Sequence, residues 1–143
     1  MATITKLASI LGNQFTGLGR VYFVKKSSDT EYTDWLRRVQ AAYRGQINVF
    51  ETINAAYDAT RSNCDDVILI SQGSHTLTTK LTVSNSRTHF IGMEYFLGMR
   101  RLQGQPTKIN MAGSTAGNDA VFENTGVRNT FRGLRFWNSN TST

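Results

Sequence analysis

The stretch Asp66–Gly92, DVILISQGSHTLTTKLTVSNSRTHFIG, constrains the fold more than any other part of the chain. A continuous apolar run opens it at Val67–Ile70. Shorter apolar groups come after it at Leu77, at Leu81 and Val83, and at Phe90 and Ile91. Turn-forming residues separate these groups at Gln72–Ser74, Ser84–Ser86 and Gly92. Strands this short and this regularly interrupted do not form a long hairpin sheet. They predict the sides of a coil that keeps winding in one direction.

The spacing of the apolar groups supports this prediction. Ile68 and Phe90 lie 22 positions apart, and so do Ile109 and Phe131. A coil of three short strands and three turns needs about twenty residues. Further apolar groups occur at Ile109 and Met111, at Val121 and Phe122, and at Phe131, Leu134 and Phe136, with turns predicted at Gly113–Asn118 and Asn124–Gly126. We therefore expect stacked strands about 4.8 Å apart, with Val, Ile, Leu and Phe turned inward.

A strand and two amphipathic helices are predicted before the coil. The strand is Val21–Val24. The first helix covers Asp34–Tyr43, with an apolar stripe of Trp35, Leu36, Val39 and Tyr43. The second runs from about Val49 to Arg61, where Asn48 followed by Glu51 resembles a capping box. Its apolar face consists of Phe50, Ile53 and Tyr57. We expect this second helix, Asn48–Arg61, to cap the N-terminal end of the stack.

Residues 1–20 form a segment of a different character. One face of a short amphipathic helix collects Ile4, Leu7, Ala8 and Leu11, and the glycines Gly12, Gly17 and Gly19 make the second half of the segment loose. Two interpretations stay open, a frayed terminus and an arm that docks on a neighbouring subunit. The predicted organisation is an N-terminal arm, 1–20, and one coil domain, 21–143.

Composition limits the classes of function. The chain has 143 residues, 39% of them apolar, which is enough for one packed domain. The net charge of +6 is spread along the sequence and indicates a generally cationic surface. The single cysteine, Cys64, excludes an intrachain disulfide and supports no cysteine metal site. Residues 1–15 lack a signal-peptide pattern, and no stretch reaches membrane-spanning length. We expect synthesis in a cytoplasm and no membrane partner.

Candidate chemistry is sparse, so no catalytic, cofactor or metal residue is predicted. Asp119 and Glu123 flank one strand and form the best carboxylate pair, but both are interpreted as solvated turn residues. Asp65 and Asp66 stand at a strand entry, where turn and cap roles are usual. His75 and His89 could approach each other on successive coils, yet no third metal ligand is evident. They are interpreted as polar side chains of the outer face.

Basic residues lie beside aromatic ones at two places, a pattern that can bind nucleic acid. The two sets are Arg128, Arg132 and Arg135 near Trp137, and Arg100 and Arg101 near Tyr95 and Phe96. In a strand, however, Phe131 and Arg132 face opposite sides, so a coil with an apolar interior requires the same alternation. Nucleic acid is therefore not the expected partner.

The order of these motifs resembles the N-terminal part of the right-handed parallel β-helix proteins, the pectin lyase-like superfamily. The residues that carry the resemblance are DVILISQGSHTL, LTV, HFIG, KINM, AVFE and NTFRGLRFWN. Phe131–Asn138 matches a V-x-I-x-G-L-x-F/I-x-N rung, with Gly133 and Asn138 in place. The resemblance implies a mainly β fold: a short right-handed parallel β-helix with an N-terminal arm and amphipathic capping helices. The Trp35 helix and the apolar stretch Met93–Pro106 depart from the family pattern.

This resemblance also frames the expected function. Phage surface and tail proteins that resemble the family combine an arm with a β-helix. We expect a bacteriophage-type virion protein, a capsid-surface, decoration or tail-fibre-type subunit, that contacts other virion subunits and forms homo-oligomers. Its contacts would be the arm, the Tyr95–Leu102 stretch and the last coil. Nothing after Phe136 caps that coil. Either the chain is part of a longer one or another subunit covers this end.

Two alternative functions remain. Polysaccharide lyases and hydrolases share this scaffold and use carboxylates on adjacent coils, often with calcium, so the chain could be the N-terminal part of such an enzyme. The enzyme hypothesis is the less favoured one. A carbohydrate-binding module would use an exposed Trp137 or Tyr95, and host-surface polysaccharide would then be the partner.

Overall fold

The computed structural model describes residues 19–34, 36–37, 48–93, 106–112 and 121–138. Its elements are β1 (Val21–Val24), β2 (Val49–Phe50), α3 (Ile53–Asp58), β3 (Asp66–Ile70), β4 (Gly73–Leu77), β5 (Leu81–Val83), β6 (Thr88–Gly92), β7 (Thr107–Met111), β8 (Phe122–Asn124), β9 (Thr130–Arg132) and β10 (Arg135–Asn138). The predicted arm, the Tyr95–Leu102 stretch and the Gly113–Asn118 turn lie wholly or almost wholly outside the described residues.

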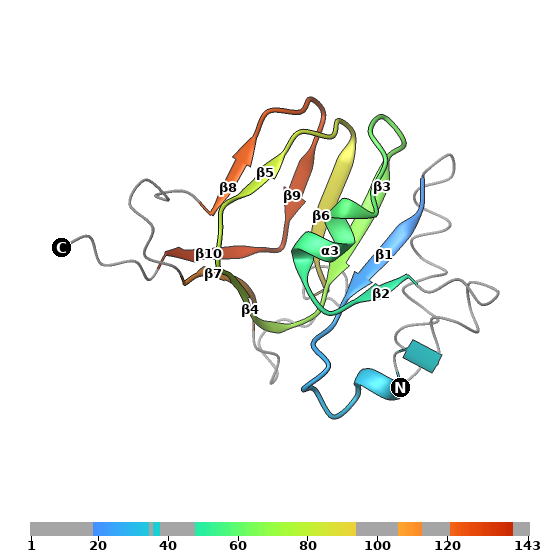
Figure 1. The fold of residues 1–143 in the computed structure, drawn as a ribbon, viewed down its shortest axis with the longest axis vertical. Helices are drawn as coiled ribbons and strands as arrows, with labels where there is room; N and C mark the ends of the chain where they lie inside the picture. The colour runs from blue at the N-terminus through green and yellow to red at the C-terminus, as the bar shows by residue number, and fades with distance from the viewer. Residues whose placement is uncertain (1–18, 35, 38–47, 94–105, 113–120, 139–143) are drawn as a thin grey trace.

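Three parallel sheets organise the fold (Figure 1). The first sheet has the order β2-β1-β3-β6-β9, the second β10-β7-β4 and the third β5-β8. From β3 onward the chain passes through the first, second and third sheets in the same order: β3-β4-β5, then β6-β7-β8, then β9-β10. We call each passage a circuit. Every strand pairing within the described residues is parallel. The predicted mainly β class with same-direction strands is therefore confirmed.

Inward side chains line up in columns across successive circuits. In the first sheet the pairing places Tyr22, Ile68, Phe90 and Phe131 in one column. Ile68 and Phe90 are completely buried, and the rings of Phe90 and Phe131 stack with centroids 5.1 Å apart. A ring pair of this kind adds about 0.5–1.5 kcal/mol beyond the burial of its area.

The second 22-residue spacing does not mark equivalent positions. Ile109 pairs with His75 and Phe136 in the second sheet, whereas Phe131 pairs with Phe90 in the first. The prediction that Ile109 and Phe131 correspond is therefore wrong. The spacing fails because the second circuit contains two long connections, 93–106 and 112–121. The number of residues per circuit is therefore not constant.

The central strands of the first sheet, β1, β3 and β6, are buried on both faces. All five residues of β3 are buried, and the outward column of Phe23, Leu69 and Ile91 is as inaccessible as the inward one. A parallel strand covered on both sides needs a continuous apolar run, which explains Val67–Ile70. In β4 and β7 buried residues instead alternate with more accessible ones, so the second sheet has one interior face.

The predicted second helix begins too early. Val49 and Phe50 form β2, which pairs with β1, and the helix α3 starts only at Ile53. The N-cap is Thr52, whose side chain accepts a hydrogen bond from the backbone N–H of Ala55, so the Asn48 and Glu51 capping box is wrong. Val49 is β-branched and Phe50 is aromatic, and both residue types favour strands. Beside the open edge of β1 they gain more stability from strand pairing than from a helical turn.

The ends of the predicted helices also differ in the structure. α3 ends at Asp58 rather than Arg61. Residues 32–34, 36 and 37 are helical, so the first helix begins at Tyr32 instead of Asp34, and 38–43 lie outside the described residues. Gly73, predicted within a turn, opens β4 with φ of 104°, a value that favours glycine.

The helix α3 packs against the first sheet (Figure 1). Its inner face, Ile53, Ala56 and Tyr57, belongs to the main hydrophobic core. The Tyr57 hydroxyl accepts hydrogen bonds from the backbone N–H groups of Ser84 and Asn85, at 2.8 and 2.9 Å. α3 is thus tied to the turn that comes after β5 as well as to the sheet.

Candidate functional site

The candidate carboxylate pair has one member within the part of the chain that the structure describes. Asp119 lies outside it, and Glu123 on β8 accepts from the Lys80 ammonium at 2.6 Å. The hydrogen bond from Lys80 lowers the pKa of Glu123. Glu123 is therefore an ion-paired carboxylate on the outer side of the third sheet.

The two histidines do not come together, and the outer-face interpretation is wrong for His75. His75 is only 4% exposed and occupies an inward position on β4. His89 is on β6, in another sheet, and its Nε2 lies 3.3 Å from a carboxylate oxygen of Asp65. Among the described residues no group of three or more His, Cys, Asp or Glu side chains could hold a metal ion.

Asp65 and His89 belong to an ion-pair cluster that joins two circuits. The guanidinium of Arg87 donates to both carboxylate oxygens of Asp65, through Nε at 2.9 Å and through Nη2. These hydrogen bonds, reinforced by that of His89, lower the pKa of the Asp65 carboxyl. Asp65 and Arg87 both have positive φ, 54° and 57°. The cluster links the turn before β3 to the turn before β6. The position of Asp65 in the first of these turns agrees with its predicted turn role.

Asp66 is a buried carboxylate with three donors. It is completely inaccessible and accepts from the backbone N–H groups of Arg20 at 2.6 Å and Arg61 at 2.8 Å. The Arg61 guanidinium donates to it as well, at 3.1 Å. A Cβ atom on Gly19 would lie 1.9 Å from Asp66 Oδ1. Gly19 is therefore required for close approach here, not for the looseness that the sequence predicted. Asp66 thus has a structural role.

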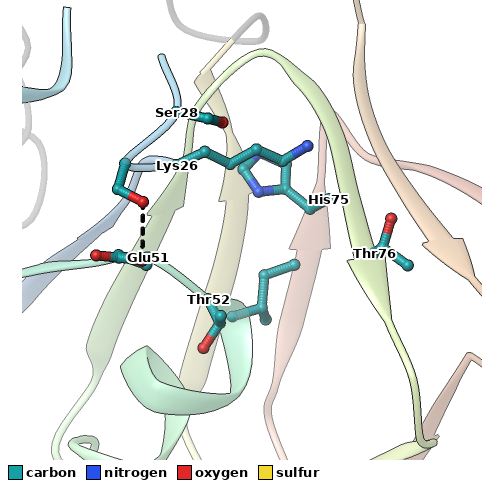
Figure 2. Close-up of a pocket in the computed structure, with 8 residues that line it drawn as sticks. Lys26, Ser28, Glu51, Thr52, His75 and Thr76 are labelled. Atoms are coloured by element: carbon teal, nitrogen blue, oxygen red, sulfur yellow. Dashed lines mark hydrogen bonds between the residues drawn. The ribbon is translucent and has the colours of Figure 1, made fainter.

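A polar hollow of about 260 Å³ lies beside the first strand of the second sheet (Figure 2). It is lined by Lys26, Ser27, Ser28, Glu51, Thr52, Ile53, His75 and Thr76. These residues come from the segment after β1, the link between β2 and α3, the start of α3, and β4. The backbone N–H of Lys25 donates to Phe50 O at 2.9 Å, which fixes the first of these segments against the second.

His75 is the least exposed polar group of the hollow. Its Nε2 lies 2.8 Å from the backbone oxygen of Ser71. Because a carbonyl oxygen only accepts, Nε2 carries the proton and Nδ1 has a free lone pair. Burial lowers the pKa of His75, so the ring is neutral at pH 7. Ile109 and Phe136 occupy the same column on the following circuits, and the imidazole is thus a polar group at an otherwise apolar position.

Two charged side chains line the hollow without pairing to each other. Lys26 forms no ion pair with another residue that the structure describes, whereas its neighbour Lys25 contacts Asp29 at 3.2 Å. Glu51 accepts a hydrogen bond from the Ser27 hydroxyl at 3.0 Å, as Figure 2 shows. The hollow therefore presents a cation, a held carboxylate and a neutral acceptor to solvent.

Sequence reasoning missed this hollow. One signal could have found part of it: Gly73, His75 and Leu77 share one side of β4, and Leu77 is an obvious core residue. The alternation of a strand therefore turns His75 inward. No sequence pattern indicated that residues 26–28 and 51–53 lie beside it.

The opposite end of the stack is apolar and accessible. β8, β9 and β10 are the last strands of their sheets, and we call the surface formed by residues 121–138 the open end. It contains a hollow of about 410 Å³ lined by Val121, Phe122, Asn124, Phe131 and Phe136. The large hydrophobic side chains that are exposed in the described residues all lie here: Val127 at 63%, Phe136 at 48% and Trp137 at 57%.

The basic and aromatic residues of the open end obey the inside-outside alternation. Phe131 is half-buried in the inward column, and Arg132 is exposed. Arg128 and Arg135 are exposed as well, and the Lys108 ammonium lies 4.7 Å from the centroid of the Trp137 ring. The second predicted basic set, around Arg100, lies outside the described residues.

Comparisons with protein-family models, with curated proteins and with solved structures found no match to this chain. Within the described ranges, no helix combines the length and apolar character needed to cross a membrane. Cys64, predicted to be semi-buried between helix and strand, is indeed half-buried and lies between α3 and β3.

Proposed function

We propose that the chain is a short right-handed parallel β-helix that serves as a structural subunit of a bacteriophage-type virion. Its place would be that of a capsid-surface, decoration or tail-fibre-type protein. It would assemble with itself and with other virion subunits through the arm, 1–20, and through the open end. The observation that carries the assembly role is the concentration of exposed apolar side chains at the open end, with Phe136 and Trp137 on β10 and Val127 between β8 and β9.

Two physical properties of the open end favour association there. A last strand presents N–H and C=O groups that have no neighbour in their own sheet, and these groups template pairing with another chain. The three sheets also end together, so a partner could pair with several edges and cover the hollow of Phe122, Phe131 and Phe136 at once. Exposed contiguous apolar surface of this kind is typical of protein–protein contacts.

The virion assignment rests on the resemblance to the β-helix superfamily and on the arm followed by stacked strands. It is tested directly by antibodies raised against the chain and applied to electron micrographs of particles from the source. Labelling of capsids or tails supports the proposal. Particles that remain unlabelled, while the antibody detects the chain elsewhere in the same preparation, contradict it.

The assembly role is tested by light scattering of the full chain and of two matched variants. Phe136→Ser removes an apolar side chain that lines the open-end hollow, and Val127→Ser removes one that is exposed but not among its lining residues. We expect oligomers that the first variant weakens and the second leaves intact. Removal of residues 1–18, which keeps the Arg20 backbone groups that bind Asp66 and Val67, should leave the stack folded and abolish assembly. A wild-type chain that stays a 16.0 kDa monomer contradicts the proposal.

One observation favours a second candidate, carbohydrate binding. Trp137 is 57% exposed on the outer side of the second sheet, where it is aligned with Asn110 and Thr76. An aromatic ring beside an amide and a hydroxyl is a surface on which sugars stack. Lys108 occupies one part of this surface, however, since its ammonium lies over the indole ring. A glycan array with Trp137→Ala as the control tests this candidate, and equal signals from both chains would rule it out.

A further inference from the structure

We propose that the polar hollow beside His75 binds a small hydroxylated anion, a molecule that carries hydroxyl groups and one carboxylate or phosphate. The proposal does not depend on the virion assignment or on association at the open end, because the hollow lies at β4, the opposite limit of the second sheet. The groups that the hollow presents and its size together define the ligand.

The hydrogen bonding of His75 calls for a donor on the ligand. The Nε2 atom of His75 is satisfied by Ser71 O at 2.8 Å, so Nδ1 is the ring nitrogen that is left for a ligand. Within the described residues Nδ1 has no partner, and His75 lines the hollow. Because the neutral ring offers Nδ1 as an acceptor, its complement is a donor, which a ligand hydroxyl supplies.

The charge of Lys26 calls for an anionic group on the ligand. Lys26 and His75 both line the hollow, so a ligand bound there can reach both side chains. Lys25, one position earlier, already has Asp29 and Glu31 as partners, whereas Lys26 has no acidic partner among the described residues. A ligand anion would supply that partner. A Lys ammonium is a compact charge that accepts carboxylate and phosphate alike.

The remaining wall of the hollow is polar and favours further hydroxyl groups. Glu51 is held by Ser27, and its carboxylate offers acceptor positions to ligand hydroxyl groups. Ser28 and Thr76 add hydroxyls that both donate and accept. A carboxylate in the wall also disfavours ligands with a second anionic group. The lining therefore selects one anionic group attached to hydroxyl-bearing carbons.

The size of the hollow limits the ligand to a compact molecule. Binding sites for drug-sized molecules usually enclose about 300–1,000 Å³. A hollow of about 260 Å³ is slightly smaller, which suits a molecule of a few carbon atoms rather than a polymer. Ile53 supplies the apolar contact in the lining, against which the carbon chain of the ligand can pack.

The test is a titration of the full chain with defined probes, monitored through the imidazole resonances of His75 by NMR. D-glycerate and glycerol 3-phosphate combine hydroxyls with one anionic group and distinguish a carboxylate from a phosphate source. Glycerol lacks the charge, and acetate and inorganic phosphate lack the hydroxyls. His75→Gln assigns the resonances. We expect a saturable shift with at least one of the first two probes and at least about tenfold weaker binding of the other three.

Two lysine variants make the test specific. Lys26→Met keeps the aliphatic stem and removes the charge, and it should weaken binding of the effective probe about tenfold or more. Lys108→Met removes a charge on the outer side of the second sheet and should change nothing. The proposal is overturned if no probe gives a saturable shift, if acetate or phosphate binds as well as the hydroxylated anions, or if both variants behave alike.

Discussion

Removal of the Asp66 carboxylate should destabilise the fold more than removal of any surface acid. The side chain is completely inaccessible, and its oxygens accept from the backbone N–H groups of Arg20 and Arg61. In Asp66→Ala both N–H groups lose their acceptor. The two residues belong to different segments, one before β1 and one after α3, so the carboxylate links three parts of the chain.

These contacts set the magnitude of the loss. An orphaned buried donor costs about 1–3 kcal/mol, so two of them give about 3 kcal/mol when each takes a value in the lower half of that range. The lower half applies because Arg20 and Arg61 are themselves exposed, and water can reach part of their backbone. The Arg61 guanidinium is left without its partner but is hydrated, so it adds little. A loss of about 3 kcal/mol is a large fraction of the 5–15 kcal/mol that typical domains have.

The measurement is chemical denaturation monitored by circular dichroism, with the free energy of unfolding extrapolated linearly to zero denaturant. Asp66→Asn preserves the volume and separates lost hydrogen bonds from a new cavity; it should still cost more than about 1 kcal/mol. Asp29→Ala is the matched control, because Asp29 pairs with Lys25 at the surface and should cost less than about 1 kcal/mol. If Asp66→Ala is no more destabilising than Asp29→Ala, the carboxylate does not hold these segments.

Three further predictions concern single positions. Gly92→Ala places a Cβ atom 2.0 Å from Gly133 O. The variant should lose about 1–3 kcal/mol of stability and show faster amide hydrogen exchange in β9. Unchanged exchange would contradict the register of the last circuit. The folded-state pKa of His75 lies below 6.5, so the unfolded chain binds more protons than the folded one at lower pH. The free energy of unfolding should therefore fall as the pH drops below about 6.5. A similar decline in His75→Gln would exclude this cause. Thr52→Ala should lower stability by about 1 kcal/mol, measured by denaturation, and an unchanged value would show that the N-cap bond to Ala55 contributes nothing.

The sequence predicted β1 and β3 of the first sheet well because burial on both faces leaves an unambiguous pattern. Val21–Val24 and Val67–Ile70 are apolar runs too short for a helix, and each is a strand with nearly the predicted bounds. The pairing of Ile68 with Phe90 also agrees with their spacing, since the first circuit has only short connections. Where connections are short, spacing and register agree.

Prediction failed where a tertiary contact outweighed a local pattern. Phe50 has the spacing from Ile53 and Tyr57 of an amphipathic helix, yet β2, which contains it, pairs with β1 because the edge of β1 is adjacent in space. Sequence reasoning assigns His75 to the surface because it is polar, although its alternation with Leu77 on β4 turns it inward, as its pairing with Ile109 shows. The sequence does not show that Lys26 and Glu51 lie near His75, because their proximity depends on how the segment after β1 packs.

The two limits of the stack differ in how they are covered, and this difference accounts for the positions of the two proposed surfaces. A parallel stack gains its stability from neighbours, so its first and last strands each leave an inward column incomplete. At the first limit α3 and its Tyr57 cover the column that begins with Tyr22, and a polar hollow remains beside β4, which no described strand precedes in the second sheet. At the last limit Phe131 and Phe136 continue the same columns toward solvent without a described element over them. Their exposure is therefore a property of the stacking itself: the position beyond β9 and β10 is one more layer of the same core, and it favours a partner that can supply that layer.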